Sequence, residues 1–255
     1  MILSRAGTVA AGILLACITA MSAARAETSV RIATEGAYPP FNYVENNEPA
    51  GFEIDLGRAL CAAMGVTCTF VLQDWDGMIS GLKEHRYDAI MSSMEITPER
   101  RKRISFSGRY YRVPSALIGH KSTPLVPPGS EPILTGKAVG AVQDSEFAGY
   151  LESVPGGDLR TFGKLEEASL DLMIGRLDYV LGDRLALRSF LESREGKRCC
   201  RFVAEVPVNR GEGIGVGLRR DDAALREKFD AAILAVQADG TYDRIRAKYF
   251  PFDIR

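Results

Sequence analysis

The sequence has few of the residues on which most catalytic and metal sites depend. It contains two histidines, and both His85 and His120 lie in contexts typical of surface or structural residues. Its cysteines have no CxxC spacing and no histidine close by, which argues against a metal site. The glycine-rich run 211–217 leads into a strand rather than a helix, the reverse of a dinucleotide-binding fingerprint. We therefore expect no catalytic residues, no metal and no cofactor.

Long hydrophobic runs are also missing, except at the N-terminus. A positively charged start, Met1–Arg5, precedes the apolar residues 6–20, and Ala24-Arg25-Ala26 follows as a small-x-small cleavage site. The run is shorter than the ~20 residues that a membrane-spanning helix needs. These features predict a cleavable secretory signal over residues 1–26. A lipoprotein box ending at Cys17 is a less favoured alternative.

The predicted mature chain has no excess of positive charge. The full sequence has 32 basic and 33 acidic residues, and removing Arg5 and Arg25 leaves 30 basic residues and a formal charge of −3. Because phosphate binding depends on clustered lysine and arginine, we do not expect nucleic acid as a partner.

Four cysteines remain after removal of the signal: Cys61, Cys68, Cys199 and Cys200. Disulfides persist in secreted proteins, and four cysteines allow three pairings. A Cys61–Cys68 bridge is favoured, because the two residues lie on a predicted helix and the strand after it. Cys199 and Cys200 form either a vicinal disulfide or two free thiols, and the pattern does not decide between them.

Short β-branched runs alternate with amphipathic segments along most of the chain, which predicts an α/β fold with a mainly parallel sheet. The predicted strands are 30–33, 67–72, 88–91, 113–118, 138–142, 179–181, 201–206 and 213–218. The predicted helices are 52–64, 76–84, 146–152, 165–175, 184–192, 222–238 and 241–249.

Two loop-like stretches interrupt this alternation, at residues 121–136 and 206–213. We interpret the strands beside them as two connections between a discontinuous lobe and a central one. The discontinuous lobe is predicted over residues 27–114 plus 209–255, and the central lobe over residues 115–208. Two lobes joined by two hinge strands enclose a cleft and can close over a ligand.

Polar and aromatic side chains follow several predicted strands, at the sheet edge where open α/β folds bind ligands. The segments that carry them are 34–41, 74–77, 92–100 and 181–183. A family likeness is carried by Val30-Arg31-Ile32, by Gly51-Phe52-Glu53-Ile54-Asp55-Leu56, by Ser92-Ser93 with Arg100, and by the ending 215–222 with 239–242. These segments resemble the polar amino acid family of periplasmic binding proteins (family 3).

This resemblance covers nearly the whole predicted mature chain and extends to Cys61 and Cys68, which fall at the family's disulfide positions. It is strongest with the lysine/arginine/ornithine and histidine binders, with some likeness to opine binders. It implies the type II two-lobe periplasmic-binding-protein fold. It also implies a periplasmic substrate-binding component of an ABC importer, whose partners are a membrane permease and a cationic L-amino acid such as arginine, ornithine, lysine or histidine. A monomer is the default expectation, because nothing in the sequence suggests a symmetric interface.

By the same resemblance, Arg100 binds the ligand's α-carboxylate as a bidentate fork, and Ser92 and Ser93 complete the main-chain contacts of the ligand. Asp183 from the central lobe pairs with the ligand's ammonium group. Ser145 and Glu146 fall in the central-lobe carboxylate loop. Glu146 replaces a hydroxyl residue there, so its contact is expected through the backbone N–H.

The predicted side-chain pocket combines aromatic rings with carboxylates. Tyr38 and Trp75 can sandwich a cationic side chain, with about 0.5–2 kcal/mol for each good contact. Glu35 supplies the acid expected in a binder of basic amino acids, and Glu95 either faces the ligand or points to solvent. Because two empty carboxylates repel each other, their pairing favours a cation between them.

Two other functions remain open at this level. Secreted cyclohexadienyl (prephenate/arogenate) dehydratases share the fold, although acidic Glu35 and Glu95 would repel their anionic substrates. Opine binders accept a ligand with an additional carboxylate, which Glu95 would also repel.

Overall fold

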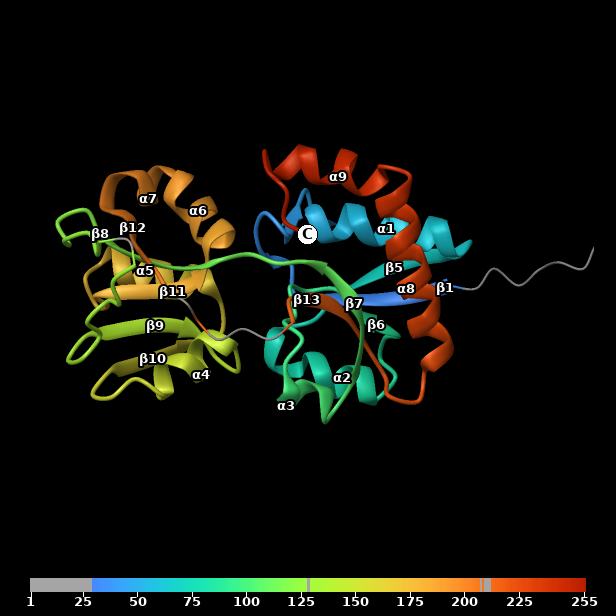
Figure 1. Cartoon of the computed structure of the whole chain (residues 1–255), viewed down its shortest axis with the longest axis horizontal. Coiled ribbons are helices and arrows are strands. Elements are labelled where there is room, and N and C mark those ends of the chain that lie inside the picture. Colours follow the sequence, from blue (N-terminus) through green and yellow to red (C-terminus); the bar gives the residue numbers. More distant parts are fainter. Residues whose placement is uncertain (1–28, 128, 207, 209–211) are drawn as a thin grey trace, which may run out of the picture.

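The computed structural model describes residues 29–127, 129–206, 208 and 212–255. The predicted signal over residues 1–26 and the alternative lipidation site at Cys17 lie outside the described residues. In the described part of the chain, the strands form two five-stranded sheets and one small three-stranded sheet. Figure 1 shows the two large sheets side by side, each with its own helices, and the chain passing between them.

The first lobe contains a sheet with the strand order β5-β1-β6-β13-β7. The strands are β1 (Ser29–Thr34), β5 (Thr67–Leu72), β6 (Ala89–Ile90), β7 (Ser105–Tyr111) and β13 (Ile214–Leu218). Strand β1 is parallel to β5 and β6, and β13 is antiparallel to β6 and β7. The small antiparallel sheet of β2 (Ala37–Tyr38), β3 (Asn42–Glu45) and β4 (Glu48–Ala50) follows β1.

Helices cover both faces of this sheet because successive side chains of a strand point to opposite faces. Val30 and Ile32 belong to the core under α1 (Phe52–Met64), α8 (Ala223–Ala238) and α9 (Thr241–Tyr249). Ala33 and Ile90 belong to a separate core with the short elements η1 (Trp75–Gly77) and α2 (Met78–Lys83). The turn of α3 (Pro98–Arg101) lies near α2 (Figure 1).

The second lobe contains the other sheet, with the strand order β10-β9-β11-β8-β12. Its strands are β8 (Ser115–His120), β9 (Ala138–Val142), β10 (Asp158–Phe162), β11 (Tyr179–Asp183) and β12 (Cys200–Glu205). Its helices are α4 (Glu146–Glu152), α5 (Leu165–Met173), α6 (Arg184–Glu192) and α7 (Arg194–Cys199). Strands β9, β10 and β11 are parallel, while β8 is antiparallel to both β11 and β12.

The chain passes between the sheets twice, from β7 to β8 and from β12 to β13. The C-terminal part therefore returns to the sheet that the N-terminal part began. This arrangement is the predicted two-lobe α/β fold. The lobe boundaries at residues 114/115 and 208/209 stay a prediction.

Several elements differ from the sequence-based expectation. The predicted helix 76–84 is divided into the 3₁₀ turn η1 and α2, and the predicted strand 113–118 begins only at Ser115. Strands β2, β3, β4, β7 and β10 and helix α7 were not predicted. Within the described residues, no helix is both long and apolar enough to cross a membrane.

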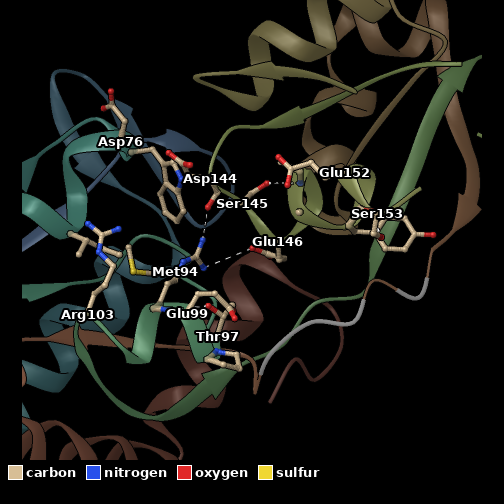
Figure 2. Close-up of a pocket in the computed structure, with 17 residues that line it drawn as sticks. Asp76, Met94, Thr97, Glu99, Arg103, Asp144, Ser145, Glu146, Glu152 and Ser153 are labelled. Atoms are coloured by element: carbon tan, nitrogen blue, oxygen red, sulfur yellow. Dashed lines mark hydrogen bonds and ion pairs between the residues drawn. The ribbon is translucent and has the colours of Figure 1, made fainter. Parts of the chain in front are cut away.

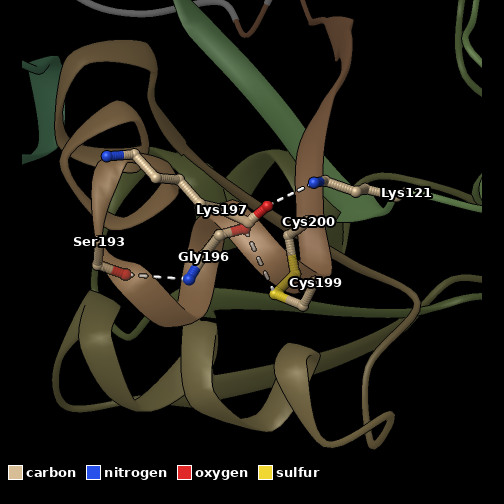
Figure 3. The surroundings of a disulfide bond; sticks show 6 residues. All are labelled: Lys121, Ser193, Gly196, Lys197, Cys199 and Cys200. Carbon is tan, nitrogen blue, oxygen red and sulfur yellow. Dashed lines mark hydrogen bonds between the residues drawn. A yellow bond between two sulfur atoms is a disulfide. The ribbon is translucent and has the colours of Figure 1, made fainter.

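The described part of the chain contains two disulfides. Cys61 in α1 is bonded to Cys68 in β5, with 6.1 Å between the Cα atoms, which confirms the favoured pairing. Cys199 and Cys200 form a vicinal disulfide where α7 passes into β12 (Figure 3), and so the alternative of two free thiols is excluded.

Candidate functional site between the lobes

The loops after β1 and β6 meet at one edge of the first sheet. Ala33 pairs with Ile90 in the parallel register, so the residues that follow both strands leave the sheet at the same place. The Glu35 N–H donates to the Ser92 hydroxyl oxygen at 2.9 Å. This bond from a backbone N–H to a side-chain hydroxyl therefore fixes Glu35 and Ser92, two of the predicted site residues, to each other.

Ser93 is held by a buried carboxylate that the sequence interpretation did not select. Its φ angle is +53°, a conformation that non-glycine residues adopt only with support from their surroundings. The carboxylate of Glu53 accepts from the Ser93 N–H at 2.8 Å and from the Ser93 hydroxyl at 3.1 Å. The Tyr111 hydroxyl donates to the Ser93 oxygen at 2.7 Å. Glu53 and Tyr111 thus fix the orientation of the Ser93 side chain.

Glu53 also supports the first site loop. Its side chain is fully buried and accepts from the Asn42 amide at 2.8 Å and from the Tyr110 hydroxyl. The Asn42 side-chain oxygen accepts in turn from the Gly36 N–H at 3.0 Å. Burial raises the pKa of Glu53, although the surrounding donors favour its ionised form.

An acidic residue in the first turn of a helix usually complements the helix dipole at the surface, and Glu53 fits that pattern in α1. A signal that could have identified it is its helical spacing, because Leu56, Gly57 and Leu60 lie three, four and seven residues further along α1 and share its buried face.

Asp183 stands at the end of β11 and faces the first lobe. Its side chain is nearly inaccessible, with 3% exposure, and it accepts from the Tyr38 hydroxyl at 2.7 Å. This hydrogen bond joins the two lobes across the cleft. It brings together one aromatic and one acidic residue that the sequence analysis assigned to the same ligand.

Arg100 makes a second connection between the lobes. Its guanidinium donates to the Glu95 carbonyl at 2.9 Å in its own lobe and to the Asp144 carbonyl at 3.0 Å in the other. It lies over the Trp75 ring, 5.2 Å from the centroid, and 3.8 Å from the Glu146 carboxylate. Figure 2 shows Asp144 and Glu146 on the second-lobe side of these contacts.

A cavity between the lobes is lined by eight of the ten predicted site residues. These are Glu35, Tyr38, Trp75, Ser92, Ser93, Ser145, Glu146 and Asp183, together with Val142, Phe147 and Leu165. Its volume is about 30 Å³, well below the roughly 300 Å³ at which small-molecule sites begin. A ligand of amino-acid size can therefore enter only when the lobes separate. A larger cavity of about 870 Å³ lies alongside and shares Trp75, Ser145 and Glu146 with it (Figure 2).

Glu95 and Arg100 are not among the residues that line the smaller cavity. The Glu95 carboxylate accepts from the Gly213 N–H at 2.8 Å, and its backbone forms a bridge to Ile214. With 1% exposure, Glu95 does not point to solvent. The structure places it against the chain that returns from the second lobe.

The acids of the cavity favour a cationic ligand. Burial raises the pKa of Glu35 to about 7, the nearby Lys164 lowers it, and the charges of Asp74 and Glu167 raise it further. Removing water from a carboxylate disfavours its charged form, and a ligand cation beside Glu35 would reverse that effect.

We predict that the affinity for a cationic ligand falls as the pH is lowered through 7. Protonation of Glu35 removes a charge partner, so L-arginine should bind about tenfold more weakly at about pH 6 than at about pH 8. Isothermal titration across this interval measures the dependence. The same titration with Glu35→Gln should show weaker binding and almost no dependence on pH, and an equal slope in both proteins would contradict the assignment.

The sign of the effect on stability is opposite. The folded-state pKa of Glu35 lies above its usual value of about 4.3, so the folded protein loses stability as the pH rises from that value to about 7. Glu35→Gln should therefore raise the melting temperature at pH 8 while it weakens binding.

A cavity lined by carboxylates and aromatic rings between two α/β lobes, with the chain crossing twice between them, defines a two-lobe binding protein. The chain matches the bacterial extracellular solute-binding proteins, family 3, over residues 30–252. The protein therefore belongs to this family, and the resemblance inferred from its motifs is confirmed.

Individual relatives are similar over almost their whole length. The chain is 38% identical over 251 residues to the L-arginine-binding protein of Pseudomonas aeruginosa, covering 95% of this chain and 96% of that protein. It is 38% identical over 242 residues to the lysine/arginine/ornithine-binding periplasmic protein of Escherichia coli, covering 92% of each. The crystal structure of a periplasmic His/Glu/Gln/Arg/opine family-binding protein from Silicibacter pomeroyi in complex with lysine has a TM-score of 0.78 and 36% identity, covering 89% of this chain and 99% of that one.

Proposed function

We propose that this protein binds a cationic L-amino acid, with arginine, ornithine and lysine preferred, in the cleft between its lobes. The observation that carries the proposal is the composition of the cavity, in which Glu35, Glu146 and Asp183 stand beside the rings of Tyr38 and Trp75. Carboxylates attract the charged groups of such a ligand, and aromatic faces attract its cationic side chain. The ligand names of the relatives support the same class.

In this proposal the two lobes contact different parts of the ligand. Glu35 and the aromatic pair hold the cationic side chain, and Asp183 holds the ammonium group. Ser92 and Ser93 contact the main-chain part of the ligand, and Arg100 turns toward its carboxylate when the lobes separate. When the lobes close, the contacts between them form again around the bound ligand.

We propose further that the protein acts as a monomer in the periplasm, after removal of residues 1–26, and delivers its ligand to the permease of an ABC importer. Lobe boundaries at residues 27–114 plus 209–255 and at residues 115–208 fit this role, because closure then presents both lobes to the permease. No bond is made or broken in the ligand. The residues of the cleft act by binding, and none is assigned a catalytic role.

Isothermal titration of the purified protein tests the proposal. L-arginine, L-ornithine, L-lysine, L-histidine, L-glutamine and octopine are titrated separately, and at least one of the first three should bind with a Kd of about 1 µM or lower. Binding of glutamine or octopine without any cationic amino acid would contradict the pocket assignment. Absence of heat with all six, combined with turnover of prephenate, would favour the dehydratase alternative.

A further inference from the structure

The charged residues that line the smaller cavity all have the same sign. Among the residues that the structure describes, the charged members of this lining are Glu35, Glu146 and Asp183, and no lysine, arginine or histidine is included. A ligand with a free carboxylate therefore meets three acids within the cleft. Its carboxylate must find a cation outside this lining, and Arg100 is the candidate that the family resemblance names.

Arg100 is already surrounded by oxygen atoms and an aromatic ring. Backbone carbonyls of Glu95 and Asp144 accept from its two terminal nitrogens, and the Trp75 ring covers the guanidinium. The Glu146 carboxylate supplies the negative charge at 3.8 Å, with both side chains about 10% exposed. A carboxylate of the protein therefore already lies within ion-pair distance of the guanidinium that a ligand carboxylate would contact.

The Ser145 hydroxyl, which lies beside this pair, is already engaged by residues of its own lobe. Ser145 precedes Glu146, and its hydroxyl donates to the Val142 carbonyl at 2.5 Å while accepting from the Ala148 N–H at 3.2 Å. This hydroxyl closes the first turn of α4 and is not directed to a ligand carboxylate. The side chains of loop 144–146 thus direct a carboxylate, and not a hydroxyl donor, toward Arg100, and the backbone N–H of Glu146 is the donor that this loop can offer a ligand.

We propose that Glu146 takes the place of the ligand's α-carboxylate, and that the cleft therefore also accepts organic cations without a carboxylate. The class comprises decarboxylated basic amino acids, in which a primary amine is joined by a short chain to a guanidinium or a second ammonium group. The inference rests on the proposed function and deepens it, since the same cleft and the same cationic contacts are used.

The physical basis is competition for one guanidinium. An amino acid gains its contact with Arg100 only by displacing Glu146, which leaves two carboxylates close together in a site with little water. An amine that lacks the carboxylate keeps the Arg100–Glu146 pair intact and still places its cationic groups against Glu35 and Asp183. The gain in affinity that an α-carboxylate usually gives a ligand over its decarboxylated form is therefore reduced.

Titration with L-arginine and agmatine, its decarboxylated form, tests this inference. The full-length mature protein should bind agmatine with an affinity within about 30-fold of that for arginine, less than the full effect of one buried charge contact. Glu146→Gln frees Arg100, and it should increase the preference for arginine over agmatine by at least about tenfold. Glu166→Gln is the matched control, because Glu166 is an exposed acid of the same lobe that lines neither cavity, and its preference should equal that of the parent protein.

The outcomes distinguish a failure of this inference from a failure of the proposed function. If arginine binds tightly and agmatine more than about 30-fold more weakly in the parent protein, the cleft still binds a cationic amino acid but Glu146 does not replace its carboxylate. An unchanged preference in a folded Glu146→Gln protein overturns the inference equally. If neither compound nor any other cationic amino acid binds the parent protein, the proposed function itself is wrong. Thermal melting of each variant establishes that it is folded, and the ratio in the parent protein tests the inference even if Glu146→Gln does not fold.

Discussion

Asp183→Asn is expected to weaken the binding of L-arginine by about 100-fold or more. Asp183 is 3% exposed at the end of β11 and lines the cavity between the lobes. In the proposed complex it is the second-lobe charge that meets the ligand's ammonium group. Removing one partner of a buried, hydrogen-bonded charge pair typically costs about 2–5 kcal/mol. Isothermal titration measures the loss, and agmatine should lose affinity by a similar factor because it keeps the amine.

Tyr38→Phe is the control for this substitution. Asparagine at position 183 also alters the hydrogen bond from the Tyr38 hydroxyl, and that bond joins the lobes without any ligand. Phenylalanine removes the hydroxyl while keeping the aromatic face, so it should change the affinity only a few-fold, about 1 kcal/mol or less. If both variants lose affinity equally, closure of the lobes and not the ligand's ammonium group explains the importance of Asp183.

The parts of the fold that could be predicted are those in which local pattern and packing agree. The predicted helix 52–64 is α1, because its apolar spacing forms one buried stripe and Gly65 ends it with a φ angle of +68°. Predicted strands 67–72 and 138–142 coincide with β5 and β9. Their short apolar runs are bounded by turn residues, and neighbouring strands stabilise the same conformation.

Elements without such a pattern were missed because distant strands hold them in place. Strand β7 reads Ser-Phe-Ser-Gly-Arg-Tyr-Tyr, which has little regular alternation, and it becomes a strand by pairing with β13 more than 100 residues later. Strand β10 is short and largely exposed and depends on β9. Strand propensity depends strongly on such context.

The same division applies to the candidate site. Glu35 and Ser92 follow strands and Asp183 ends one, so their place at the sheet edge could be predicted from chain order alone. The orientation of Glu95 toward Gly213 and the pairing of Arg100 with Glu146 depend on how the returning chain and the second lobe approach the first. Those contacts join residues far apart in the sequence, and no local sequence pattern predicts them.

Glu53→Gln is expected to weaken ligand binding and lower the stability of the protein together. The four groups that contact the Glu53 carboxylate, namely the Ser93 N–H and hydroxyl, the Asn42 amide and the Tyr110 hydroxyl, all donate to it. Glutamine replaces one acceptor oxygen with an NH₂ group, so at least one buried donor loses its partner. An unsatisfied buried group costs about 1–3 kcal/mol, and more when a charge is involved. The melting temperature should therefore fall by about 2–12 °C, since 1 kcal/mol corresponds to roughly 2–4 °C in a chain of this size.

The effect on binding distinguishes a positioning role from a purely structural one. Ser93 and, through Asn42, Gly36 are held by Glu53, so both site loops should loosen and the Kd for L-arginine should rise about tenfold or more. Ser107→Ala is the matched control, because the Ser107 hydroxyl accepts from the Val216 N–H in the core of the same lobe and contacts neither loop. It should lower the melting temperature and leave the Kd unchanged at a temperature where both variants are folded. Faster amide exchange at Ser93 and Gly36 in Glu53→Gln, with unchanged exchange in β13, would locate the loosening at the site. A Kd for arginine equal to that of the parent protein would show that Glu53 supports the fold of the lobe and not the geometry of the cleft.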